Sequence, residues 1–144
     1  MLYIVSVAMD QLVTRIAILD MQNNYVLEPL RIELPLTNNP KALTTLTQHI
    51  NQYILASGIA KEKFAGIGIG MPGFVDVTKG INHSFLKTES GSSIVSIVEA
   101  AVGIPVFIDN DSSLIALAEL KFGAARNKQT VMVVNVGWGI GLGM

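Results

Sequence analysis

Runs of apolar residues separated by short polar breaks dominate the start of the chain. Such runs predict buried strands at Leu2–Met9, Leu12–Asp20 and Tyr25–Leu34. The breaks between them, Asp10-Gln11 and Gln22-Asn23-Asn24, are short enough to be hairpin turns. We therefore expect these strands to form an antiparallel meander.

The pattern then changes to helical spacing. Asn39 suits an N-cap, Pro40 suits the first helical position, and Gly58 suits the C-terminal stop. Between them, apolar residues recur every three or four positions at Leu43, Leu46, Ile50 and Ile54. This spacing predicts a helix with one apolar face.

The rest of the chain alternates short strands with helices. The expected strands are Phe64–Ile69, Pro105–Ile108 and Thr130–Val136, with a small hairpin at Phe74–Asn82. The expected helices are Ser93–Val102 and a segment that is capped by Asp109-Asn110-Asp111 and runs through Phe122. The order βββαβαβαβ predicts an α/β fold: a mixed sheet in which the meander is followed by right-handed βα crossovers, with helices on both faces. It is the order of a ribonuclease-H-like half-domain followed by the start of another.

The composition is apolar and poor in charge. Hydrophobic residues make up 50% of the 144 residues and charged residues 15%, which excludes a disordered chain and a coiled coil. With 10 basic and 11 acidic residues and no cluster of Lys and Arg, we expect this chain alone not to bind nucleic acid. The absence of cysteine excludes disulfides and thiolate metal sites, and is compatible with a cytoplasmic location.

We expect neither a signal peptide nor a membrane span. The apolar start Met1–Met9 has no basic region before it and is followed at once by Asp10. The most apolar stretch, Val131–Met144, is shorter than about 18 residues and rich in glycine, so it is expected to be a core segment.

One candidate for ligand chemistry is Gly68–Gly73, which matches the pattern G-x-G-x-x-G. In a dinucleotide site this pattern must open a helix, whereas here Phe74-Val75-Asp76 is strand-like. A tight loop at the carboxyl end of a strand is therefore favoured. Open α/β sheets bind ligands at that same edge.

A second candidate is Asp109-Asn110-Asp111, which follows the next strand. One of these residues is expected to cap the helix. A carboxylate here could also accept a proton from a hydroxyl, and the amide could pair with a polyol. Both interpretations stay open.

The remaining candidates are weaker. The glycines of Gly137–Gly143 could let the backbone approach an anion, but the bulk of Trp138 favours a plain glycine-rich hairpin. His49 and His83 are isolated along the chain and are expected on the surface. No spacing typical of a metal site or of a catalytic triad occurs, so we expect no metal.

Three segments together resemble the ROK family of sugar kinases and sugar-responsive transcriptional regulators. They are Gly66–Asp76 with Gly80, Ile104–Asp111 followed by Ala116, Ala118, Glu119 and Gly123-Ala124, and Val133–Gly143. The resemblance covers the chain in the family's order and implies the actin/hexokinase-like ATPase fold. It implies that residues 1–124 form the N-terminal lobe of the sugar-binding domain and that residues 125–144 begin a C-terminal lobe, here truncated.

The resemblance also implies a degenerate nucleotide site. ROK kinases hold the phosphates of Mg-ATP on an Asp-x-Gly-Gly-Thr motif in the first hairpin, and here its aspartate is Ala8. The Gly-Gly-Thr positions are held by Asp10, Gln11 and Leu12. A carboxylate would repel a polyphosphate at this point. The second phosphate turn, Gly-Thr-Gly in the family, reads Gly137, Trp138 and Gly139. We therefore expect no ATP or magnesium cofactor.

The sugar side of the family's site is retained. The Asn-Asp pair, whose aspartate is the catalytic base in the kinases, falls on Asn110 and Asp111, and the Pro-Gly loop that walls the sugar falls on Pro72 and Gly73. An asparagine that the family uses after the hairpin is not matched in His83–Leu86. Sugar contacts without a phosphate site are the pattern of the ROK regulators.

We therefore expect the non-catalytic, sugar-sensing part of a cytoplasmic ROK-type regulator that forms homo-oligomers. DNA would bind only through a helix-turn-helix that this chain lacks, and zinc only in the C-terminal lobe. Two alternatives stay open: a glucokinase-like, ATP-dependent sugar kinase with Asp111 as general base, or an interaction module with a vestigial sugar site. The apolar segment Val131–Met144 would be covered by the second lobe; on its own, we expect it to pack out of register, pair with another copy or aggregate.

Overall fold

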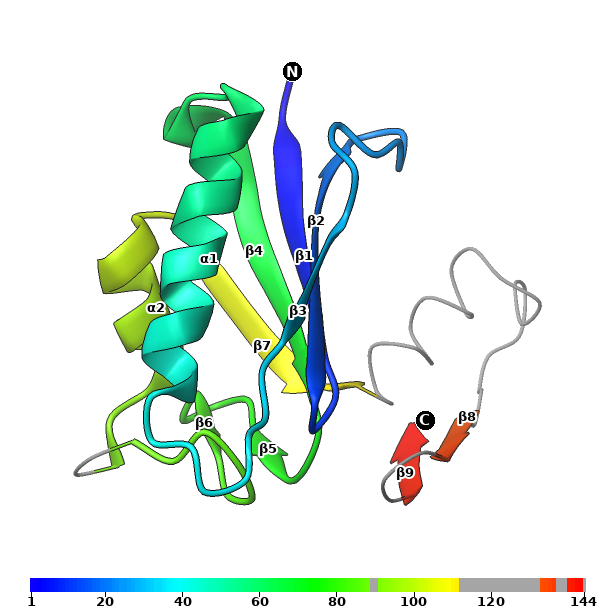
Figure 1. The fold of residues 1–144 in the computed structure, drawn as a ribbon, viewed down its shortest axis with the longest axis vertical. Helices are drawn as coiled ribbons and strands as arrows, with labels where there is room; N and C mark the ends of the chain where they lie inside the picture. Colours follow the sequence, from blue (N-terminus) through cyan, green and yellow to red (C-terminus); the bar gives the residue numbers. More distant parts are fainter. Residues whose placement is uncertain (89–90, 112–132, 137–139, 144) are drawn as a thin grey trace.

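The computed structural model describes residues 1–88, 91–111, 133–136 and 140–143. A five-stranded sheet lies beside two helices, and a small hairpin lies at one end of the sheet (Figure 1). The strands of the sheet are β1 (Tyr3–Met9), β2 (Val13–Asp20), β3 (Leu30–Glu33), β4 (Phe64–Met71) and β7 (Val106–Asn110). The other elements are α1 (Ala42–Ser57), the 3-10 helix η1 (Lys61–Lys63), β5 (Val75–Asp76), β6 (Ile81–Asn82), α2 (Ile94–Val102), β8 (Val133–Val136) and β9 (Ile140–Gly143).

The strand order of the main sheet is β3-β2-β1-β4-β7. β1 pairs antiparallel with β2, and β2 pairs antiparallel with β3, which confirms the predicted meander. β4 pairs parallel with β1, and β7 pairs parallel with β4. The sheet is therefore mixed, as expected, with α1 and α2 in the connections that lead into the parallel strands.

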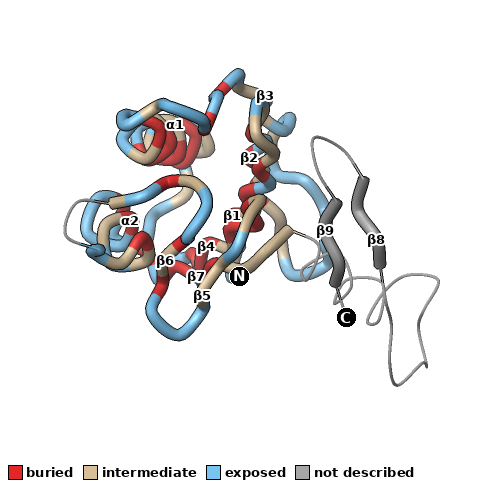
Figure 2. Tube along the Cα trace, turned by 90° about the horizontal axis from the view of Figure 1, so that it is seen from below, coloured by how far each residue is buried: buried red, intermediate tan, exposed pale blue. Residues whose placement is uncertain are grey.

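Both described helices cover the same face of the sheet (Figures 1 and 2). Two right-handed crossovers that step in the same direction along a sheet place their helices on one face. The sequence predicts a further helix after β7, which would supply the cover for the other face. Beyond Asp111, that segment lies outside the described residues.

The core lies between the helices and the sheet, where buried residues of both appear red in Figure 2. Alternate residues of the strands are apolar and buried, as are the inward-facing residues of the helices. The most deeply buried include Val5, Val7, Ile16, Ile18, Ile67, Ile69, Met71, Leu46, Ile50, Ile94 and Val98. Because side chains alternate along a strand, a slip of one residue would turn each of these strand residues to the other face. The core therefore fixes the register of the sheet.

The first helix begins after the expected position. Its first residue is Ala42, Lys41 stands at the N-cap without a side-chain hydrogen bond, and Pro40 lies in the turn before it. Asn39 is therefore not the N-cap; its Oδ1 accepts a hydrogen bond from the Lys41 N–H at 3.3 Å and stabilises that turn. The predicted end is confirmed, since Gly58 caps the helix with φ +71°.

The second helix agrees with the sequence at both ends. Ser93 is its N-cap and accepts a hydrogen bond on Oγ from the backbone N–H of Ser96 at 3.2 Å. Gly103 ends it in the left-handed conformation, with φ +80°.

The third strand is shorter than predicted. The sequence indicated Tyr25–Leu34, whereas β3 starts only after Pro29, which has no N–H to donate to a ladder. Tyr25 makes an isolated bridge to Leu19 instead.

The end of the chain contains a short hairpin in which β8 pairs antiparallel with β9. β8 falls inside the expected strand Thr130–Val136. The phosphate-turn positions Gly137, Trp138 and Gly139 lie outside the described residues, and so does the expected domain boundary between residues 124 and 125. Within the described part of the chain, no helix has the length and hydrophobicity needed to cross a membrane.

Candidate functional site

The carboxyl ends of β4 and β7 bring two sequence-predicted motifs together. Their parallel register sets Gly70 opposite Asp109 and Met71 opposite Asn110. β4 was expected to end at Ile69, but it remains extended through Met71. The Pro-Gly loop therefore starts directly beside the end of β7.

One hydrogen bond joins these motifs across 37 positions of sequence. The Nδ2 of Asn110 donates to the carbonyl oxygen of Gly73 at 2.7 Å. The backbone N–H of Asn110 donates to Oδ1 of Asp109, also at 2.7 Å. Asp111 directly follows β7 and is half-buried. The fold thus gathers an amide, carboxylates and the Pro72-Gly73 loop at one edge of the sheet.

Gly73 is required here for two physical reasons. Its φ is +94°, a backbone conformation that residues with a side chain rarely adopt. A Cβ at this position would also lie 2.6 Å from the Cβ of Ser84. The loop therefore packs tightly against the segment that follows β6.

Asn82 holds that segment in place and was not among the residues predicted from the sequence. Its side chain is 3% exposed, and its Nδ2 donates to the carbonyl oxygen of Pro72 at 2.8 Å. Its Oδ1 accepts from the backbone N–H groups of Ser84 at 2.8 Å and Phe85 at 2.9 Å. The only signal in the sequence was an asparagine in a short hairpin, where this residue type commonly forms turns. The sequence does not show that Asn82 lies next to Pro72, so its hydrogen bond to that loop could not be predicted.

The backbone of Phe74 is held on both sides. Its N–H donates to Oγ of Ser84 at 3.0 Å, and its carbonyl accepts from the N–H of His83 at 2.7 Å. The carbonyls of Pro72, Gly73 and Phe74 thus all have fixed partners. We call residues 72–74 the clamped loop.

The turn between β1 and β2 lies at the same edge, because β1 runs parallel to β4 and β7. Oδ1 of Asp10 accepts hydrogen bonds from the backbone N–H groups of Leu12 at 2.8 Å and Val13 at 2.7 Å. The backbone N–H of Asp10 donates to the carbonyl of Val13 at 2.9 Å. The carboxylate therefore holds two backbone donors of the kind that an anion would use. A nucleotide phosphate therefore does not fit this turn, because the N–H groups that would bind it already donate to Asp10.

The glycine pattern at residues 68–73 does not form a dinucleotide-binding turn. Gly68 and Gly70 lie within β4, where they alternate with buried apolar residues. The chain then enters β5 and not a helix, whose N-terminus a pyrophosphate would require.

The two histidines have different surroundings. On α1, Nδ1 of His49 lies 2.9 Å from the carbonyl oxygen of Thr45. His83 is exposed and its ring contacts the ring of Phe74, with centroids 5.5 Å apart. In the described ranges, no group of three or more His, Asp or Glu side chains lies close enough to hold a metal ion.

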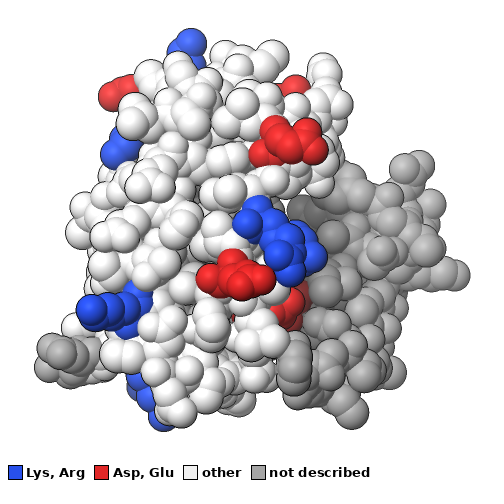
Figure 3. Space-filling view, in the orientation of Figure 1, with Lys and Arg blue, Asp and Glu red and all other residues white. Residues whose placement is uncertain are grey.

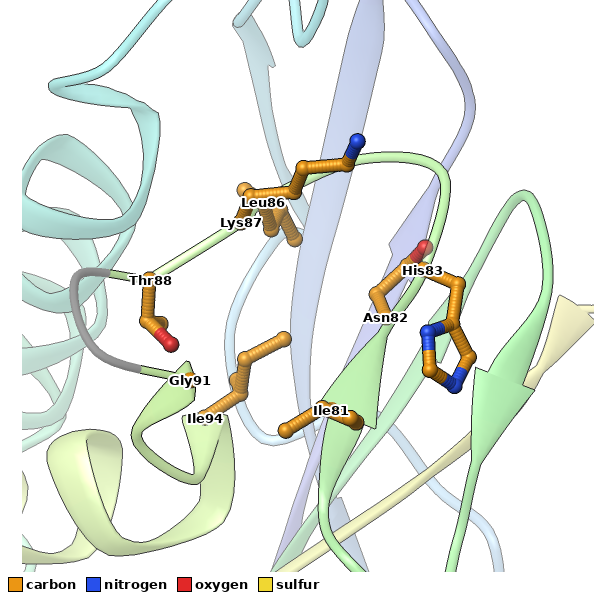
Figure 4. Close-up of a pocket in the computed structure, with 8 residues that line it drawn as sticks. All are labelled: Ile81, Asn82, His83, Leu86, Lys87, Thr88, Gly91 and Ile94. Atoms are coloured by element: carbon orange, nitrogen blue, oxygen red, sulfur yellow. The ribbon is translucent and has the colours of Figure 1, made fainter.

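A cavity of about 260 Å³ lies beside the hairpin formed by β5 and β6 (Figure 4). It is lined by Ile81, Asn82, His83, Leu86, Lys87, Thr88, Gly91 and Ile94. Neither the clamped loop nor Asn110 lines it. It adjoins the clamped loop through Asn82 and His83 but does not include Asn110.

The face in Figure 3 carries basic and acidic side chains next to one another, with wide uncharged areas between the groups. It shows no basic patch of the kind that binds a phosphate backbone.

Known proteins with similar sequence and structure include both regulators and kinases. A model of the ROK family matches residues 7–144. The DNA-binding transcriptional repressor Mlc of Escherichia coli (strain K12) is 29% identical over 131 residues, which are 90% of this chain and 32% of the repressor. A glucokinase of Halalkalibacterium halodurans is 26% identical over 102 residues, which are 70% of this chain and 31% of the kinase.

A solved structure shows the same fold. A ROK family transcriptional regulator, a homologue of the E. coli Mlc protein, superposes with a TM-score of 0.79 over 97% of this chain and 35% of that chain, at 21% identity. The chain spans about a third of the length of the curated relatives named above. It has the fold of the N-terminal lobe of hexokinase-like proteins, and it belongs to the ROK family.

Proposed function

We propose that this chain is the sugar-sensing lobe of a ROK-type transcriptional regulator and that it does not transfer phosphate. The observation that carries the proposal is that an acidic side chain occupies the backbone donors of the turn between β1 and β2. There the carboxylate of Asp10 accepts hydrogen bonds from the N–H groups of Leu12 and Val13. An incoming phosphate would have to displace this carboxylate and would then lie beside a like charge.

The sugar side supports the same proposal. Asn110 and Asp111 offer an amide and a carboxylate, which pair well with the hydroxyl groups of a polyol. The hydrogen bond from Asn110 to Gly73 holds the amide group of Asn110 against the clamped loop. Such a pre-formed arrangement loses little freedom when a ligand binds.

In the proposed mechanism, sugar binds between this lobe and a second lobe and shifts the equilibrium toward the closed arrangement. The relatives named above are about three times as long as the matched segment, which leaves room for a second lobe and a DNA-binding domain. We propose that residues 1–124 form the first lobe, that DNA contact is made by another domain, and that the protein acts as a homo-oligomer. This lobe itself uses no cofactor; zinc would be held by the second lobe.

Calorimetry of the full-length protein with glucose, xylose and N-acetylglucosamine tests the sugar site. We expect at least one sugar to bind, and Asn110→Ala and Asp111→Ala to weaken its binding tenfold or more, on the order of 1.4 kcal/mol. Asp20→Asn is the matched control, because Asp20 is the last residue of β2, at the opposite end of the sheet. No binding by any sugar, or equal binding by Asp111→Ala, would overturn the assignment.

A sugar kinase is the second candidate, favoured by Asp111 at the position of the family's catalytic base and by the glucokinase relative. The assay is sugar-dependent ADP release by the full-length protein with ATP and magnesium. We expect none above background, in the wild type and in Asp111→Ala alike. Release that depends on sugar and disappears in Asp111→Ala would establish the kinase and refute the regulator without catalysis.

A further inference from the structure

Phe74 exposes a large apolar side chain at a site that is otherwise polar. It is 70% exposed and follows Gly73, the residue bonded by Asn110. β5 begins one residue later and lies close to β7, so the backbone of Phe74 lies beside the candidate site. The hairpin and the carboxyl ends of β4 and β7 lie together in Figure 1.

The exposure of Phe74 does not come from a loose loop. Its N–H and its carbonyl are both hydrogen-bonded, to Ser84 Oγ and from the His83 N–H. Its ring meets the imidazole of His83 at an interplanar angle of 51°. Figure 4 shows the His83 ring on the β5 side of β6, away from the space between Ile81 and Leu86. Phe74 is thus presented on a rigid backbone with a second ring supporting one side.

We infer that the rings of Phe74 and His83 form an aromatic wall that receives the C–H face of a cyclic sugar. This inference rests on the proposed sugar site and adds a second kind of contact to it. A sugar ring has hydroxyl groups around its edge and C–H groups on its faces. Asn110 and Asp111 suit the hydroxyls, whereas a flat aromatic ring suits the C–H face.

The wall selects for a ligand class. A pyranose in its chair form, such as glucose or xylose, presents a C–H face to an aromatic ring. The open-chain polyol glucitol carries comparable hydroxyl groups but has no ring face. Both kinds of ligand offer hydroxyl groups to the polar side chains, but only the cyclic form offers a C–H face to the wall.

The experiment compares full-length wild type with Phe74→Leu, Phe74→Tyr and Val77→Ala, titrated calorimetrically with glucose, xylose and glucitol. Phe74→Leu keeps an apolar side chain but removes the flat ring, so we expect roughly tenfold weaker binding of the pyranose. Phe74→Tyr keeps the ring and retains the affinity. Val77, 57% exposed in the same hairpin, is the matched control and retains it too.

A second readout reports contact directly. In saturation-transfer NMR with irradiation of the aromatic protons, the C–H protons of one sugar face should gain the most intensity, and Phe74→Leu should remove this difference. Loss of stability alone would not select one face of the ligand. Equal pyranose affinity in wild type and Phe74→Leu, or equal wild-type affinity for pyranose and glucitol, would overturn the wall.

The two proposals fail in different ways. If a pyranose binds and Asn110→Ala weakens it while Phe74→Leu does not, the sugar site stands and the aromatic wall is wrong. If Phe74→Leu weakens binding but Asn110→Ala and Asp111→Ala do not, the wall stands and the polar part of the site is wrong. If no sugar binds, both are overturned.

Discussion

Replacing Asn82 by alanine should loosen the clamped loop at a measurable cost in stability. The side chain makes three hydrogen bonds, one to the Pro72 carbonyl and two from the backbone N–H groups of Ser84 and Phe85. A buried hydrogen bond contributes about 1 kcal/mol net, so Asn82→Ala should lower the free energy of unfolding by about 3 kcal/mol. For a domain of this size the corresponding fall in Tm is roughly 10 °C.

Urea unfolding followed by circular dichroism measures this change, provided that the m-value stays constant. Asn51→Ala is the matched control, because Asn51 makes a single side-chain hydrogen bond, to the carbonyl of Ala101 at 3.0 Å, and its Oδ1 has no partner among the described residues. We expect the control to cost less than about 1 kcal/mol. If the two variants differ by less than about 1 kcal/mol, Asn82 is not the residue that holds the loop.

Three further changes test other parts of the fold. Gly73→Ala should lower the free energy of unfolding in urea by at least about 2 kcal/mol, because it combines a positive φ with a Cβ clash. Gly58→Ala has a positive φ but open space around it, so it should lower this free energy by about 1 kcal/mol. Equal losses in the two variants would contradict the packing of the loop. Ile69→Ala should cost about 2–5 kcal/mol and Ile69→Val about 1 kcal/mol, since this side chain is fully buried; a cost below 1 kcal/mol for alanine would contradict its place in the core. A hydrogen bond from the backbone of Asn24 is the main cause that holds the pKa of Asp20 below its ordinary value of 3.8. The resulting stabilisation is present above pH 3.8 and is lost as the pH falls through the lower, folded-state pKa, so Asp20→Asn should show a smaller loss of stability in urea titrations below pH 4; an unchanged slope would refute it.

Much of the fold follows from local patterns in the sequence. The apolar runs of β1 and β2 and the short polar turns between strands leave little choice but an antiparallel meander. The ends of α2 are set by Ser93 and Gly103, whose side-chain and backbone preferences act within one turn of helix. These elements were predicted because their causes lie close together in the chain.

The differences arise where distant parts of the chain decide the local structure. Gly70 was expected in the loop after a strand that ends at Ile69, yet pairing with both β1 and β7 keeps it extended. Asn39 is a good helix cap by type, but it stabilises the turn before the helix instead. Asn82 gains its role only from the approach of Pro72, which is ten positions away. The predicted sugar residues Asn110 and Gly73 are hydrogen-bonded to each other. The parallel register of β4 and β7 brings them together, and this register cannot be read from the sequence.

The clamped loop also limits how this protein can change over evolutionary time. Surface loops usually tolerate insertions and deletions, and families often alter ligand preference by changing loop length. Here each of three successive carbonyls accepts a hydrogen bond from one fixed donor. A single added residue would shift these carbonyls away from their donors and break the hydrogen bonds. Diversification at this edge of the sheet should therefore proceed by exchanging side chains at positions 74 and 83 while the length of the loop stays constant.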